Sequence, residues 1–377
     1  MIVPFGRAGK WHAEQGVTQV QSSPWVATQQ QYLVPSYGYL RAIYLSLTAS
    51  GGSGSAAAYV ATGGGANSND APFNVFSNIL VADVNGTPLF NLDGFAAYLS
   101  ALYGAYRIFG RIAYPFAAFA PGVDYSAASY SAPSAAGLFK FIQPIFFEFA
   151  RDGLGCMPNM DASAAYKVTV TYNSPATGGG PSNVYSALTG TAPGLTTQLE
   201  ALMRSRPAST DPYGNTQETQ PPSPGTVQYW SSQTFQVSAG SNTIILARVG
   251  NIIRNHILLF RDANGDRSTA DSTGVTPTVM EVDWDAGQRT ILNVATLRQI
   301  AYEWNNFDNP AGVVPMQYTD DPNGIALNEY GDGWIPTVGS TKFQFRFTSS
   351  APGTLQVITN DIVPGASDLY SVNILGR

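Results

Sequence analysis

The chain has 377 residues, of which 44% are hydrophobic and only 12% are charged. This composition excludes a disordered polyampholyte and supplies apolar side chains for two cores of ordinary size. The formal net charge of −6 leaves no overall positive field for binding nucleic acid, so direct packaging of a genome by this chain is not expected.

The first segment, residues 1–31, is expected to be an extended or poorly ordered arm. It carries Arg7, Lys10 and Glu14, and no charged residue occurs between Gln15 and Leu40. Gln and Ser recur there without a period of 3.6 or 2.0 residues, so the segment has no face of its own to bury.

Strand signals dominate the chain after this arm. Apolar and polar residues alternate through 139–149, and KFQFRF at 342–347 places three Phe on one face. Clusters of Gly, Pro, Ser and Asn separate the strands at 48–72, 120–137, 174–182 and 206–225. This pattern predicts an all-β protein built from sandwiches with long loops.

Two helices are predicted among the strands, at 93–106 and 294–304. The first has Asn91 or Asp93 as a candidate cap, and the second has Asn293. Each helix begins directly after a predicted hairpin, so the two lie in the same local context.

This symmetry extends to both sides of the helices and predicts a tandem duplication of one sandwich. Matching the blocks places Asp83 near Asp283 at the hairpin. The further matched blocks are 38–47 with 251–260 upstream, and 147–149 and 168–173 with 345–347 and 355–360 downstream, which places Phe147 near Phe345 and Asn173 near Asn360.

The boundary between the two copies is expected near Gly240. It follows the Pro-rich stretch QPPSPG and a closing strand at 227–237. The predicted organisation is therefore an arm at 1–31, a first sandwich with long loops at 32–240, a second sandwich at 241–364 and a tail at 365–377.

Over residues 32–364 the chain resembles the tectivirus-like double jelly-roll major capsid proteins of the adenovirus-type capsid lineage. Two tandem sandwiches, a helix after the second hairpin of each, a longer first copy and few ionisable residues carry the resemblance. It implies a homotrimer whose six jelly rolls form a pseudo-hexagonal capsomer in the icosahedral shell of a non-enveloped virus or phage.

The resemblance also implies the partners and the location of the chain. Neighbouring capsomers, penton or vertex proteins and minor capsid proteins would contact it in the virion, after synthesis in the host cytoplasm. The arm has two cations and apolar Ile2, Val3, Phe5 and Trp11, which would suit an inner surface facing an internal membrane.

A carbohydrate-binding or adhesive β-sandwich, such as a fibre or cell-surface protein, is the alternative. The 20 Tyr and six Trp residues could serve either function. The N-terminal residues lack the apolar core of a secretory signal, and no stretch approaches the roughly 18 apolar residues of a membrane span. The duplication and the missing secretion signal favour a coat protein.

No catalytic, cofactor-binding or metal-binding residue is predicted, and the chain is not expected to be an enzyme. His12 lies in the arm, and His256 lies in an apolar strand, where a structural histidine is favoured over a general base. Cys156 is the single cysteine, so it can form no intramolecular disulfide and is expected to be a buried apolar side chain.

Three other patterns have chemical interpretations that are less favoured. Glu281, Asp283 and Asp285 could pair carboxylates on one face of a strand, but Trp284 points away from them. Asp262-Ala-Asn-Gly-Asp266 resembles the start of a calcium loop, although a turn is favoured because the twelfth position is Thr273. Asn85-Gly86-Thr87 fits a glycosylation acceptor, and we predict a type I′ hairpin turn there.

Overall fold

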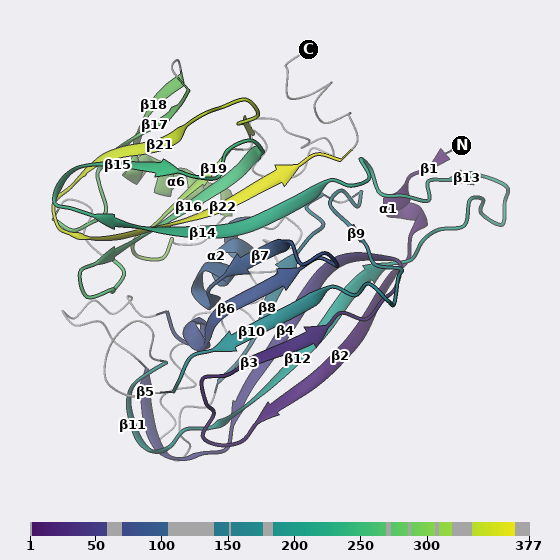
Figure 1. Cartoon of the computed structure of the whole chain (residues 1–377), viewed down its shortest axis with the longest axis horizontal. Helices are drawn as coiled ribbons and strands as arrows, with labels where there is room; N and C mark the ends of the chain where they lie inside the picture. The colour runs from purple at the N-terminus through teal and green to yellow at the C-terminus, as the bar shows by residue number, and fades with distance from the viewer. Residues whose placement is uncertain are drawn as a thin grey trace.

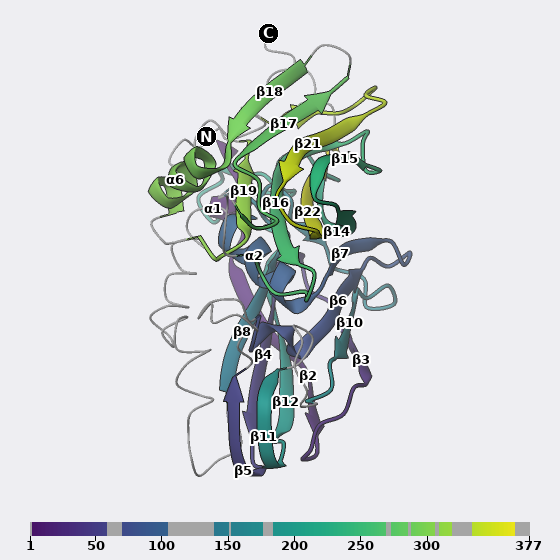
Figure 2. The same cartoon turned by 90° about the vertical axis from the view of Figure 1, so that its left-hand side faces the viewer.

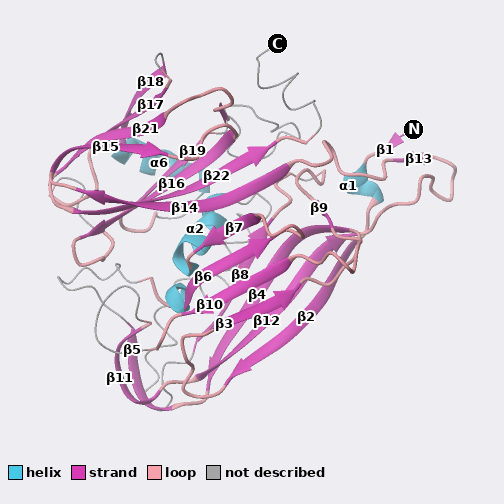
Figure 3. Ribbon diagram, in the orientation of Figure 1, coloured by secondary structure: helices cyan, strands magenta, loops and turns pink. Residues whose placement is uncertain are grey.

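The computed structural model describes residues 2–58, 70–104, 139–150, 152–175, 184–268, 273–285, 288–305, 309–318 and 334–365. These residues form two β-sandwiches that lie one above the other in Figure 1, and strands dominate both of them (Figure 3). Within these ranges, no helix is long and apolar enough to cross a membrane. The predicted tail at 365–377 lies outside the described residues except for Gly365.

The first sandwich contains eight principal strands in two sheets. In chain order they are β2 (Trp11–Gln21), β3 (Gln29–Leu33), β4 (Tyr39–Ser50), β6 (Phe76–Ala82), β7 (Pro88–Leu92), β8 (Phe139–Phe146), β10 (Lys167–Tyr172) and β12 (Gly194–Arg204). One sheet has the order β2-β12-β4-β8, and the facing strands have the order β3-β10-β6-β7. Numbered along the chain, these are strands 1-8-3-6 and 2-7-4-5, which is a jelly roll.

The second sandwich repeats this topology strand for strand. Its strands are β14 (Val227–Val237), β15 (Gly240–Leu246), β16 (Ile252–Asp262), β17 (Val279–Trp284), β18 (Gln288–Asn293), β19 (Val313–Gln317), β21 (Phe343–Ser349) and β22 (Gly353–Val363). They are ordered β14-β22-β16-β19 and β15-β21-β17-β18. The prediction of two tandem jelly rolls is confirmed.

In the described residues, each jelly roll carries a helix directly after its fifth strand, as predicted. These are α2 (Gly94–Gly104) and α6 (Val294–Asn305). Asp93 Oδ1 accepts a hydrogen bond from Ala96 N at 2.9 Å, and Asn293 Oδ1 accepts one from Thr296 N at 3.2 Å. Both side chains thus cap a helix N-terminus in the same way. Helix α2 is buried, whereas one face of α6 is exposed.

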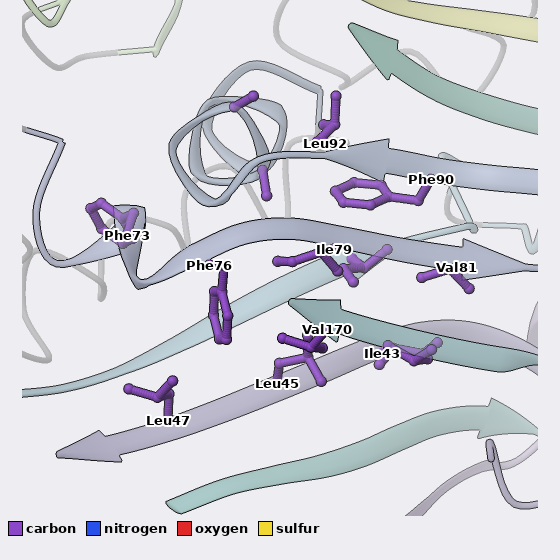
Figure 4. Packing of buried hydrophobic residues seen from close by; sticks show 14 of the residues in the cluster. Ile43, Leu45, Leu47, Phe73, Phe76, Ile79, Val81, Phe90, Leu92 and Val170 are labelled. Atoms are coloured by element: carbon purple, nitrogen blue, oxygen red, sulfur yellow. The ribbon is translucent and has the colours of Figure 1, made fainter. Parts of the chain in front are cut away.

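The core of the first jelly roll follows from alternation along its strands. Ile43, Leu45 and Leu47 of β4 point inwards, and Ile79 and Val81 of β6 face them from the other sheet (Figure 4). All five side chains are fully buried. The intervening residues of β4 point away from this core, which gives the period of two that the sequence showed.

Strand register fixes which residues correspond between the two copies. Ala42 of β4 pairs with Phe146 of β8 and Leu202 of β12. Asn255 of β16 pairs in the same way with Gln317 of β19 and Asn360 of β22. Ala42, Phe146 and Leu202 therefore correspond to Asn255, Gln317 and Asn360.

The upstream part of the predicted alignment agrees with this register, but the downstream part is wrong by one strand. Phe147 follows β8 and donates its N–H to Arg41 O at 2.8 Å, just as Tyr318 follows β19 and donates to Arg254 O at 3.1 Å. Phe147 thus corresponds to Tyr318 and not to Phe345. The predicted match of Asn173 with Asn360 has the same error. Asn173 follows β10, the seventh strand of its jelly roll, whereas Asn360 lies in β22, the eighth. Alternating Phe residues mark any strand with one buried face, so they cannot identify a particular strand.

Minor elements extend the two sandwiches. The pairs are β1 (Ile2–Val3) with β13 (Thr216–Gln217), and β5 (Ser53–Ala58) with β11 (Tyr185–Thr191) at the far end of the first sandwich in Figure 2. Single short strands β9 (Met157–Pro158) and β20 (Ile335–Pro336) pair with β4 and β16. The short helices are α1 (Phe5–Ala8) and η1 (Phe73–Val75).

The N-terminal residues differ from the expected arm, because β2 is the first strand of the first jelly roll. It pairs with β12 from Trp11–Arg204 to Gln21–Leu195 and has a bulge near its centre. Backbone hydrogen bonds to a neighbouring strand hold an edge strand even when its side chains are mostly exposed. This segment is therefore a strand of the sandwich, although it has no buried face of its own.

A parallel pairing of β14 with β7 joins the two jelly rolls. Trp230 pairs with Phe90 and Ser231 with Asn91. One continuous sheet consequently runs β3-β10-β6-β7-β14-β22-β16-β19. The expected boundary near Gly240 falls between β14 and β15, and both of these strands pair with strands of the second jelly roll.

Candidate functional site

A buried ion cluster connects the first jelly roll to the second. Asp70 Oδ2 accepts a hydrogen bond from Arg261 Nη2 at 2.5 Å, and Asp70 Oδ1 lies 3.1 Å from Arg267 Nε. The Arg267 guanidinium also lies over the ring of Phe95, 4.7 Å from its centroid. Only 4% of the Asp70 side chain is exposed, so this carboxylate depends on its two cations for stabilisation.

The C-terminal end of α2 is held by side chains of the second jelly roll. The last carbonyls of a helix have no partner within it. Here Gly104 O accepts a hydrogen bond from Arg254 Nη1 at 2.5 Å, and Tyr103 O accepts one from Gln317 Nε2 at 2.8 Å. The Tyr103 hydroxyl donates to Asn309 Oδ1 at 2.7 Å. The helix end is thereby fixed to the second jelly roll.

Close packing accompanies these hydrogen bonds. A Cβ atom on Gly104 would lie 2.1 Å from Cζ2 of Trp230, so only glycine fits at that position. At the other end of α2, Gln356 Nε2 donates to Asp93 Oδ2 at 2.5 Å. Figure 1 shows α2 between the two sandwiches. The two jelly rolls are thus locked together as one mechanical unit.

A second buried ion cluster anchors the N-terminal residues. Glu148 accepts hydrogen bonds from Arg41 Nε and from Arg204 Nη2, the latter at 3.0 Å. Arg204 Nη1 also donates to Gly6 O at 2.8 Å. Phe5 is fully buried and meets the ring of Tyr39 edge-on at 5.2 Å. Phe5 is therefore a core residue and is not available to an inner membrane surface.

His256 is a core histidine. Its ring is fully buried beside Phe343 and Phe345, with centroid distances of 5.0 and 5.3 Å. Its Nδ1 lies 3.0 Å from the Tyr318 hydroxyl. Burial lowers the pKa of His256 to about 3, so the ring is neutral at physiological pH. With no solvent access, it is not placed to act as a general base.

The other candidate nucleophile and base are equally structural. Cys156 Sγ lies 3.4 Å from Glu148 Oε2, and burial raises the pKa of this thiol well above its usual value. His12 lies on the exposed strand β2 with its Nε2 3.7 Å from Glu14 Oε2. His256 lies in the second jelly roll, and His12 and Cys156 lie in the first. Among the described residues, no hydrogen bond joins any two of these three side chains.

Two of the three acidic residues singled out at 281–285, Asp283 and Asp285, have local partners. Asp283 Oδ2 accepts a hydrogen bond from Gln344 Nε2 at 2.7 Å and lies 3.3 Å from Arg346 Nη2. Asp285 lies beyond the end of the strand with a φ of 55° and accepts a hydrogen bond from Ser340 Oγ at 2.6 Å. Among the described residues no group of three His, Cys, Asp or Glu side chains could hold a metal ion.

The calcium-like sequence at Asp262 is a hairpin turn, as favoured from the sequence. Asp262 Oδ1 accepts hydrogen bonds from Asn264 N at 2.8 Å and Asp266 N at 3.0 Å, and Gly265 has a φ of 87°. Its carboxylate therefore closes the turn by binding its own backbone.

Asp83 builds the same kind of turn in the first jelly roll. Its Oδ1 accepts from Asn85 N at 2.8 Å and Thr87 N at 2.7 Å. The predicted type I′ turn is wrong, because that type needs positive φ at both central residues and only Gly86 has one, at 87°. The side chain of Asp83 favours the alternative turn.

The sequence interpretation missed Asp70 and Glu148, which carry the two buried ion clusters. Both residues lie outside the helices and strands, and their partners Arg204, Arg261 and Arg267 are far away in the sequence. For Glu148 the usable signal was its partner Arg41, an arginine within a duplicated apolar strand. An arginine inside an otherwise apolar strand indicates a buried partner.

Comparison with known proteins supports the architecture alone. No model of a protein family and no curated protein matches the sequence. The crystal structure of the STIV MCP matches with a TM-score of 0.64 and 14% identity, covering 97% of this chain and 100% of that chain. The atomic structure of Sulfolobus Turreted Icosahedral Virus matches with a TM-score of 0.60 and 12% identity, covering 96% and 92% of the two chains.

A third match is PBCV-1 VP54, fitted into a reconstruction of the virophage Sputnik. Its TM-score is 0.59 at 10% identity, with 94% of this chain and 93% of that chain covered. These neighbours are double jelly-roll major capsid proteins. The chain has the double jelly-roll fold. In that fold α2 and its surrounding ion cluster occupy the joint between the two jelly rolls.

Proposed function

We propose that this chain is the structural major capsid protein of an icosahedral, non-enveloped virus or phage. The observation that carries the proposal is the exact repetition of the jelly-roll strand order in two locked copies, over the whole length of the STIV MCP. The buried polar groups described above hold the two copies together, which suits a structural component of a shell. The chain would then act in the virion shell.

The proposal includes a homotrimeric capsomer with six jelly rolls around its axis. Neighbouring capsomers, vertex proteins and minor capsid proteins would be its partners. Contact with an internal membrane would fall to the exposed apolar residues near the N-terminus, of which Ile2 is 66% and Trp11 70% exposed. Phe5, which is buried, would take no part in it.

We also propose a revised division of the chain. The first unit would end at Arg204 and the second would begin at Val227, with 205–226 as the linker. The support is that β14 and β2 hold the same place in the two strand orders. The QPPSPG stretch would then separate the units, and the closing strand would begin the second one.

Electron microscopy of the purified full chain tests the capsid proposal. We expect class averages with three-fold symmetry and six lobes, and sheets or shells of these particles at high concentration. Isolated two-lobed particles at micromolar concentration would contradict it. Binding of such monomers to a glycan array would instead favour the adhesive module.

A further inference from the structure

The two jelly rolls differ in whether equivalent edge strands are paired with another strand. Within the chain, the edge of β7 is occupied by β14, through the pairs Trp230–Phe90 and Ser231–Asn91. The counterpart of β7 in the second jelly roll is β18, and the counterpart of β14 in the first is β2. In the described part of the chain, β18 pairs only with β17, and β2 pairs only with β12.

The open edge of β2 has little charge and no proline, and the open edge of β18 carries an exposed apolar side chain. Edge strands in monomeric proteins carry charges, prolines or short lengths that prevent pairing with another chain. Strand β2 has 11 residues, one acidic residue and no proline, and its Val17 and Val20 are 56% and 69% exposed. On β18, Ile291 is 63% exposed. Such edges are suited to pairing with a further strand.

We propose that β18 of one copy pairs in parallel with β2 of a second copy, repeating between chains the β7–β14 joint within the chain. The inference rests on the proposed capsomer, and it names the surfaces that meet in it. The strand register within the chain predicts which residues pair between the two copies. Ala13 and Trp230 both pair with corresponding residues, Leu202 and Asn360, so Ala13 takes the place of Trp230. Phe90 lies three residues before the helix cap Asp93, and Thr290 lies three residues before the equivalent cap Asn293. Thr290 therefore takes the place of Phe90, and Ala13 faces Thr290.

One polar contact of the intrachain joint also has an equivalent of the same chemical type at the new joint. Gln356 of β22 donates to Asp93, the N-cap of α2. The residue corresponding to Gln356 is Gln198 of β12, and the residue corresponding to Asp93 is Asn293, the N-cap of α6. Gln198 lines a shallow depression of about 310 Å³ on the open face of its sheet. It is therefore accessible to donate to Asn293 of the second copy.

The two edges lie on different jelly rolls, so the contact is head-to-tail. A head-to-tail contact closes into a ring or continues as a filament. The intrachain joint connects the two jelly rolls of each chain, and the new joint connects one chain to the next. Each chain therefore adds two jelly rolls. Three chains would complete the six-lobed capsomer proposed above.

Cysteine cross-linking tests the register directly. Neighbouring strands lie about 4.8 Å apart, which is within the Cα separation that a disulfide spans. The variant A13C/T290C should therefore form chains linked between copies on mild oxidation, seen on a non-reducing gel. The native Cys156 is buried and should not interfere. The matched control is V20C/T290C, in which Val20 lies roughly 20 Å further along the strand.

Light scattering on the same samples separates this inference from the capsomer itself. A trimer in which only A13C/T290C cross-links supports the pairing. A trimer in which this variant fails to cross-link, or in which V20C/T290C links equally well, overturns the pairing and leaves the capsomer. Cross-linked ladders that extend beyond three chains support the pairing and contradict closure at three. A monomer that never cross-links contradicts both.

Discussion

Arg41 and Arg254 occupy the same place in the two jelly rolls. Each is the extra residue of a β-bulge, in β4 opposite Leu202 and Met203 and in β16 opposite Asn360 and Asp361. A bulge redirects the side chain of its extra residue. Arg41 reaches the Glu148 cluster, whereas Arg254 reaches Gly104 O at the end of α2. The duplicated arginine thus stabilises the Glu148 cluster in the first jelly roll and the contact with α2 in the second.

The ion cluster at Asp70 should be the most sensitive polar element of the joint between the jelly rolls. In D70A, Arg261 and Arg267 lose the carboxylate that faces both of them in a buried site. We expect a loss of about 3–5 kcal/mol in the free energy of unfolding, measured by chemical denaturation.

The matched control for D70A is R346Q. Arg346 forms a partly exposed pair with Asp283, with 42% of the arginine side chain accessible. This variant should cost less than about 1 kcal/mol. Equal losses for the two variants would show that the Asp70 cluster does not hold the joint.

The contact of Gly104 with Trp230 should be intolerant of one added methyl group. G104A places a Cβ 2.1 Å from Cζ2 of the indole, so we expect a loss of about 1–3 kcal/mol. Because the clash involves one side chain, G104A/W230F should lose less than the sum of the two single variants. Strict additivity in this double-mutant cycle would contradict the packing described.

Acidification should weaken the fold through His256. Its folded pKa of about 3 lies below the usual value of 6.5, so the unfolded chain takes up the proton first. The stability due to the neutral ring is complete above about pH 6.5 and is lost as the pH falls towards 3, by at most about 1.4 kcal/mol per pH unit. H256F should flatten the dependence of unfolding free energy on pH over this range.

The control for that experiment is H12F, which removes the exposed imidazole. Its free energy of unfolding at pH 7 should differ from that of the native chain by less than about 0.5 kcal/mol. An H256F variant with the slope of the native chain would show that the buried ring is not responsible.

The N-terminal anchor can be tested at Phe5. F5A removes a fully buried ring from its contact with Tyr39, and we expect a loss of about 3–5 kcal/mol. I2A, at a side chain that is 66% exposed, should change stability by less than about 0.5 kcal/mol. Thermal unfolding compares the two variants, and an unchanged F5A midpoint would restore the picture of a free arm.

The sequence predicted the duplicated sandwiches and both helices because these depend on local patterns. The alternation of apolar and polar residues at 139–149 and 342–347 reveals strands, and Asp93 and Asn293 reveal where helices begin. Residues whose role depends on contacts between distant segments could not be found in this way. Asp70 meets Arg261 across 191 positions, and the partner of β2 lies on β12.

The mass of the chain in solution tests the central claim most directly. Light scattering on the purified protein at micromolar concentration should give about three times the chain mass of 40.1 kDa, because the capsid proposal requires three copies to complete six jelly rolls. A monodisperse species of 40.1 kDa would contradict it.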